Sequence, residues 1–135
     1  MTKATTLLCI AAAAFLASWF LPVMPELDGW QAFRLAVSPV WRFSGFTFSR
    51  WYEAASAVAS ALTNAAFIVS LIVIVFCRAC ATRWLAAGLA LAGVFNLWWI
   101  IVLREDARAF GFGYYSWVAS FVLLAFAVMA RRNVR

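Results

Sequence analysis

The stretch AASAVASALTNAAFIVSLIVIVFC, residues 54–77, decides the fold, because it holds 24 residues without a single charge. A helix rises about 1.5 Å per residue and the hydrocarbon layer of a bilayer is about 30 Å thick. Roughly 20 apolar residues are therefore enough to span it. The stretch predicts a transmembrane helix.

Three other gaps between charges are nearly as long, with 22 residues after Lys3, 20 after Arg83 and 22 after Arg108. The chain is 67% hydrophobic and 12% charged, whereas an ordinary soluble domain is about 25% charged. We therefore expect an all-α integral membrane protein with a single membrane domain over residues 1–135. Its expected fold class is a four-transmembrane-helix up-down bundle, with spans at about 5–24, 54–77, 84–103 and 110–130.

The first gap has a second interpretation as a signal peptide, because Lys3 precedes an apolar run. The side chains that follow this run are bulky, with Trp19 and Phe20 where a cleavage site needs small residues. We interpret the segment as a helix that the protein retains.

The charges around the predicted spans indicate the orientation of the chain. With four spans, both chain ends and the 78–83 connection share one side, which carries six basic residues and no acidic residue. The other side balances five basic against five acidic residues. Basic residues next to spans stay in the cytoplasm, so we expect both termini there, including the basic tail at 131–135. The Ala-rich composition, with more Arg than Lys, fits a bacterial inner membrane.

The net charge of +6 does not indicate nucleic-acid binding. The basic residues flank apolar spans, where they orient the chain and contact anionic lipid, and they form no dense basic patch. The expected partners are the lipid bilayer and another membrane protein or a second copy of the chain.

The first outer connection, at about residues 26–53, is rich in aromatic residues. Asp28 can cap a short helix, on which Trp30, Phe33 and Trp41 recur along one face, with a break at Pro39. Such an interfacial segment forms either a cap in the lipid headgroups or a docking surface for a larger partner. The predicted interface consists of Trp30, Phe33, Trp41, Phe43, Phe46, Phe48, Trp51 and Tyr52.

The predicted spans contain no Asp, Glu, Lys, Arg or His, which argues against proton relays, ion-coupled carriers and voltage sensors. His is absent from the whole chain, and we expect no metal site and no cofactor. Polar residues inside a membrane either join helices by hydrogen bonds or line a path for a polar substrate. These residues are Ser56, Ser60, Thr63, Asn64, Asn96, Ser116 and Ser120.

Two of them, Asn64 and Asn96, share a depth if the second and third spans run antiparallel through the 78–83 connection. An Asn amide in hydrocarbon needs hydrogen-bonding partners, and small residues such as Gly88 and Ala92 let two helices approach closely. We therefore predict that Asn64 and Asn96 bond to each other. The alternative is that either amide turns toward the first or fourth span.

Cys77 and Cys80 form a CxxC motif at the inner end of the second span, and Cys9 lies alone in the first. A CxxC beside a membrane helix in a four-helix bundle resembles the quinone-linked thiol oxidoreductases, whose bundle passes electrons between cysteine pairs. Those enzymes use a second pair and an oxidising face, whereas this sequence has no second pair and the predicted topology places the motif in a reducing compartment. We interpret the cysteines as incidental.

The sequence contains no nucleotide-binding loop or hydrolase motif, and we expect a protein that is not an enzyme. The hypothesis that fits best is a small polytopic inner-membrane protein acting as an accessory subunit or interaction partner in a membrane complex, for example of the toxin-immunity type. An alternative is a small transporter or channel subunit, in which the polar faces form a substrate path. A more distant alternative is a membrane thiol oxidoreductase that uses the CxxC motif at residues 77–80.

Overall fold

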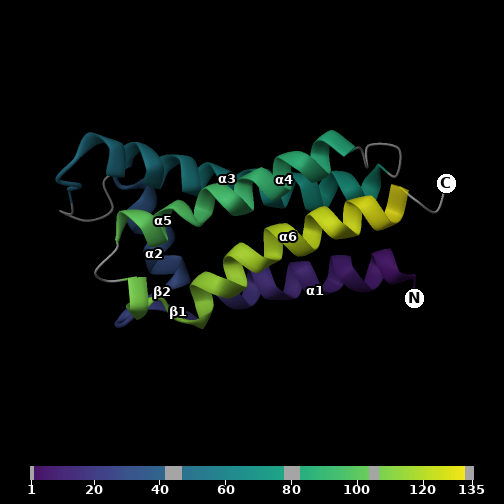
Figure 1. Ribbon diagram of the computed structural model, residues 1–135, viewed down its shortest axis with the longest axis horizontal. Helices are drawn as coiled ribbons and strands as arrows, with labels where there is room; N and C mark the ends of the chain where they lie inside the picture. Colours follow the sequence, from purple (N-terminus) through teal and green to yellow (C-terminus); the bar gives the residue numbers. More distant parts are fainter. Residues whose placement is uncertain (1, 42–46, 78–82, 104–106, 133–135) are drawn as a thin grey trace.

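The computed structural model describes residues 2–41, 47–77, 83–103 and 107–132. The protein is mostly helical (Figure 1). Three helical segments are long and apolar enough to cross a membrane, namely Trp51–Phe76, Arg83–Val102 and Phe112–Arg131. They correspond to the second, third and fourth spans that the sequence predicts.

The first apolar segment is shorter than predicted. α1 (Lys3–Ser18) has 16 residues, so the prediction that this helix continues to about residue 24 is wrong. Its last turn tightens, because the N–H of Trp19 donates to the carbonyl of Leu16, three residues back. Pro22 then prevents continuation, since it has no N–H to donate.

The chain between α1 and the next long helix folds into a hairpin and a short helix. β1 (Pro22–Met24) pairs antiparallel with β2 (Leu27–Asp28), and α2 (Gly29–Val37) follows directly. Asp28 stands at the N-cap of α2, where the sequence predicts a cap, and its backbone N–H donates to Oε1 of Gln31 over 2.9 Å. α2 packs against the helix that follows, α3 (Trp51–Phe76).

The third predicted span, at about 84–103, corresponds to the apolar segment Arg83–Val102, in which one turn residue, Leu97, interrupts the helix. A turn separates α4 (Arg83–Asn96) from α5 (Trp98–Val102). At this break the backbone carbonyl of Asn96 accepts a hydrogen bond of 2.6 Å from the hydroxyl of Tyr114. Hydropathy did not reveal the break, because both helices and the turn between them are apolar.

Three buried phenylalanines form the centre of the core. Phe15 on α1 stacks on Phe67 of α3 (Trp51–Phe76), with 4.2 Å between ring centroids. Phe67 also meets Phe121 of α6 (Phe112–Arg132) edge to face at 5.1 Å. α1 and α6 lie side by side along their length in Figure 1, and α6 also packs against α4.

Gly93, rather than the predicted Gly88, is the glycine of α4 that lies against another helix. Gly93 is buried, and a Cβ there would lie 3.3 Å from the Cβ of Phe121 on α6. Gly88 is exposed, and a Cβ there would meet nothing within 4 Å. The predicted packing seam is therefore wrong at Gly88, because small residues at four-residue spacing occur on more than one face of this helix.

Candidate ligand-binding pocket

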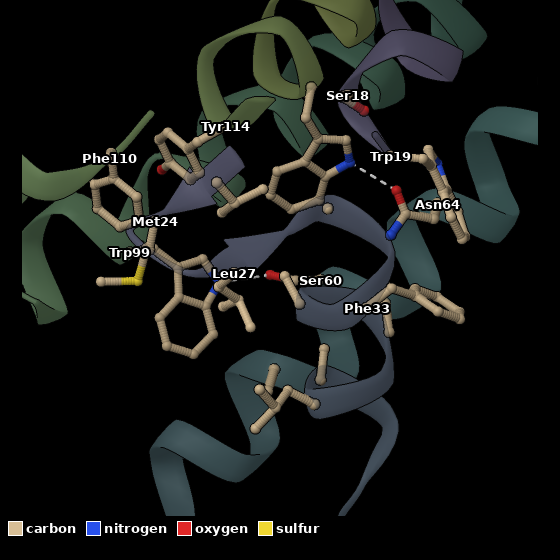
Figure 2. A pocket seen from close by; sticks show the side chains of 18 of the residues that line it. Ser18, Trp19, Met24, Leu27, Phe33, Ser60, Asn64, Trp99, Phe110 and Tyr114 are labelled. Carbon is tan, nitrogen blue, oxygen red and sulfur yellow. Dashed lines mark hydrogen bonds between the residues drawn. The ribbon is translucent and has the colours of Figure 1, made fainter. Parts of the chain in front are cut away.

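A cavity of about 280 Å³ lies at the end of the molecule where α1 ends and α3 and α6 begin (Figure 2). Its wall is built by helices α1, α2, α3, α5 and α6 and by both strands of the hairpin. The hairpin and α2 form one side of the cavity. They connect the end of α1 to α3, and α2 packs against α3. The cavity therefore depends on the short elements between the long helices.

Aromatic side chains form much of the wall. Trp19 and Phe33, from the end of α1 and from α2, lie 5.1 Å apart between ring centroids. Phe110 stacks on Tyr114 at 4.1 Å on the other side of the cavity (Figure 2). Broad apolar walls with a few placed polar groups are typical of small-molecule sites.

Asn64 is the most polar side chain in the wall and is only 8% exposed. Its Oδ1 accepts a hydrogen bond of 2.6 Å from Nε1 of Trp117. An indole N–H can only donate, so the atom that faces it must be the amide oxygen. The NH₂ group of Asn64 therefore points the other way, as Figure 2 shows, and it donates to no residue that the structure describes.

Ser60 lies one helical turn before Asn64 and is buried in the same wall. Its Oγ accepts a hydrogen bond of 2.9 Å from Nε1 of Trp99 on α5. Within the described part of the chain the hydroxyl of Ser60 donates to no other group. Both polar side chains of α3 at the cavity thus accept from a tryptophan and keep a hydrogen to donate.

The predicted bond between Asn64 and Asn96 is wrong. Nδ2 of Asn96 instead donates to Oγ1 of Thr63 over 3.1 Å, while Asn64 bonds to Trp117. Successive residues of a helix point about 100° apart, so Thr63 and Asn64 face different neighbours although they share a depth. Oδ1 of Asn96 is buried and accepts no hydrogen bond from the described residues.

The other polar residues predicted inside the spans do not line the cavity. Ser56 and Ser116 are half-buried on α3 and α6. Ser120 is fully buried and donates to the carbonyl of Trp117 over 2.6 Å, within its own helix. Among the predicted polar residues, the cavity gathers only Ser60 and Asn64.

The predicted aromatic interface divides into two groups. Phe33 and Phe48 line the cavity. Trp41 and Trp51 are 70% and 82% exposed.

Two further members of that interface, Trp30 and Tyr52, lie between these extremes. Trp30 is partly exposed, with the guanidinium of Arg34 5.5 Å from its ring centroid. The hydroxyl of Tyr52 accepts a hydrogen bond from Arg50. Phe43 and Phe46 lie outside the described residues.

Sequence reasoning missed Trp99 and Trp117 as site residues. One signal in the sequence points to them, since a tryptophan inside an apolar segment needs an acceptor for its N–H. Ser60 and Asn64, four residues apart on one helix, offer two acceptors on one face. The sequence does not show which tryptophan reaches which acceptor.

Neither Cys9 nor Cys77 lines the pocket. Cys77 follows the far end of α3 and is disulfide-bonded, which does not fit the reducing compartment that the predicted topology gives it. Cys80 lies outside the described residues. Cys9 is free and exposed on α1. In residues 2–41, 47–77, 83–103 and 107–132, no group of three His, Cys, Asp or Glu side chains is placed to hold a metal ion.

Comparisons of the chain with protein-family models, with curated proteins and with solved structures each gave no significant match.

Proposed function

We propose that the protein is an integral membrane protein that binds a small apolar molecule at one end of a four-helix up-down bundle, without catalysing a reaction on it. The observation that carries the proposal is the aromatic cavity with the buried amide of Asn64 in its wall. Protein interiors are close-packed, so a bundle that served only as a scaffold would fill this space with side chains. A cavity of this size with a placed polar group instead suits a ligand.

The membrane location is supported by the apolar surface of the long helices. Large hydrophobic side chains are exposed along them, including Leu62, Ile72 and Phe76 on α3, Leu91 on α4 and Phe126 on α6. Such a surface suits contact with lipid rather than water. α1 would supply the fourth span, since it packs along α6, and the charges favour a bacterial inner membrane with both termini in the cytoplasm.

Saturable binding of durene, a small apolar ring, to the protein in nanodiscs tests the proposal, with empty nanodiscs subtracted. We expect about one durene per chain. Ala61→Leu, which places a larger side chain at the cavity wall of α3, should abolish binding. Ala65→Leu is the matched control, because Ala65 is exposed one turn further along α3 and does not line the cavity.

A second variant that fills the cavity keeps the test valid if Ala61→Leu does not fold. Ala32→Leu fills the cavity from α2, where Ala32 is only half-buried. Durene binding that survives both Ala61→Leu and Ala32→Leu, or that never exceeds empty nanodiscs, would contradict the proposal.

A role as accessory subunit or interaction partner is the second candidate function, and the exposure of Trp41 and Trp51 favours it. Aromatic side chains dominate binding energy when a partner buries them. We propose that a second membrane protein, or a second copy of the chain, packs there. Copurification in mild detergent tests this, and an unchanged complex in the Trp41→Ala/Trp51→Ala double variant would count against it.

A further inference from the structure

We infer that the pocket binds a neutral lipophile whose carbonyl oxygen accepts a hydrogen bond from the side-chain amide of Asn64. The inference rests on the proposed binding function and adds the chemical class of the ligand. It follows from three features of the cavity, namely the direction of the polar groups on α3, the absence of charge among the described residues of its wall and the shape of its apolar surface.

The two polar side chains that α3 places at the cavity, Asn64 and Ser60, keep hydrogens to donate. Oδ1 of Asn64 is occupied by Trp117, and Oγ of Ser60 is occupied by Trp99. The two N–H hydrogens of Asn64 have no acceptor among the described residues, although the side chain is more than nine-tenths buried. An amide N–H that faces an apolar cavity gains a hydrogen bond only from a bound molecule, so an acceptor on the ligand would be stabilised here.

The described part of the wall favours an uncharged ligand. Among the residues that the structure describes, no Lys, Arg, Asp or Glu lines the cavity. A phosphate or carboxylate held there would lose its hydration without gaining an ion pair, which is strongly unfavourable. Among neutral groups, a carbonyl oxygen is the acceptor that matches an amide NH₂ in geometry and strength.

The rest of the ligand must be apolar and small. The rings of Trp19, Phe33, Phe110 and Tyr114 surround the cavity (Figure 2). Ala57 and Ala61 also line it, and their small side chains leave space on α3. A volume of about 280 Å³ lies at the small end of ligand sites. It suits a single substituted ring or a short acyl chain. The carbonyl can therefore come from a quinone ring or from the ester of a glyceride.

Two matched ligand pairs test the inference, each with and without the carbonyl. Duroquinone and durene share one methylated ring, and glyceryl monooctanoate and its octyl ether share one chain. We expect the protein in nanodiscs to prefer the carbonyl member of one pair by about tenfold, the effect of one buried hydrogen bond. The pair that shows the preference identifies the source of the carbonyl.

The variant for this test is Asn64→Leu/Trp117→Phe, which removes both partners of the bond and leaves neither group unsatisfied. We expect it to lose the carbonyl preference, measured as the ratio of the two affinities within each pair, because this ratio cancels any change that the altered wall makes to durene binding itself. Ala65→Leu should keep the preference. Equal affinities within both pairs, or a preference that survives in the double variant, would overturn the inference while leaving the binding of apolar molecules intact. Failure to bind durene at all would instead overturn the proposed function, and this inference with it.

Discussion

The indole nitrogen of Trp117 donates to the side-chain oxygen of Asn64 over 2.6 Å and joins α6 to α3 across the wall of the pocket. This contact fixes which way the amide of Asn64 points. It therefore both holds two helices together and sets the hydrogen-bonding character of the cavity.

We expect energetic coupling between these two residues. A double-mutant cycle with Asn64→Leu and Trp117→Phe should give an interaction free energy of about 1 kcal/mol, typical of a hydrogen bond between membrane helices. Unfolding in mixed detergent measures it. The matched cycle with Asn64→Leu and Asn96→Leu should give less than about 0.5 kcal/mol, because Asn96 bonds to Thr63. A larger coupling in the second cycle would contradict the arrangement of these helices.

Replacement of Gly113 by Ala should destabilise the fold. A Cβ at this position would lie 2.5 Å from the backbone carbonyl oxygen of Leu21, so the hairpin segment and the start of α6 would have to separate. We expect a loss of about 2 kcal/mol or more in the free energy of unfolding, comparable with overpacking of a core.

Gly88→Ala is the control for that substitution, because a Cβ at Gly88 meets nothing within 4 Å. Ala favours helix over Gly by about 1 kcal/mol, so this variant should be neutral or slightly stabilising. Thermal unfolding in detergent distinguishes the two. Equal melting temperatures for both variants would show that α6 does not begin against the hairpin segment.

Tyr114→Phe should weaken the junction between α4 and α5. The hydroxyl of Tyr114 donates to the backbone carbonyl of Asn96 over 2.6 Å, in a fully buried position. Removing it leaves that carbonyl without this partner, which costs about 1 to 3 kcal/mol. Tyr115→Phe is the neighbouring control, because Tyr115 is exposed. Chemical unfolding measures the stability of both variants. Equal losses in the free energy of unfolding would contradict the proposed role of the Tyr114 hydroxyl.

The proposed orientation predicts the reactivity of introduced cysteines in intact cells. Ser49→Cys, before α3, should react with a maleimide that cannot cross membranes, because that end of the bundle is placed outside the cytoplasm. Thr2→Cys, before α1, should react only with a permeant reagent. The unmodified chain provides the background from its own cysteines. Labelling of Thr2→Cys but not of Ser49→Cys by the impermeant maleimide would contradict the proposed orientation.

The sequence by itself determined the long helices. Residues 54–77 and 110–130 are predicted from uninterrupted apolar length, and the structure has α3 and α6 there, because helix formation in such runs depends on local composition. The cap at Asp28 was predicted for the same reason, since a cap depends on a few neighbouring residues.

Only the tertiary structure decided the pocket. Depth along a helix follows from counting residues, but facing neighbours depend on how each helix is rotated about its axis, which counting does not give. That rotation turned Thr63 rather than Asn64 toward Asn96 and left Gly88 exposed. The cavity further requires the chain after Ser18 to turn back over α3, and the carbonyl of Asn96 requires Tyr114 from a helix that begins 16 residues later. These contacts join residues far apart in the chain, so no local pattern records them.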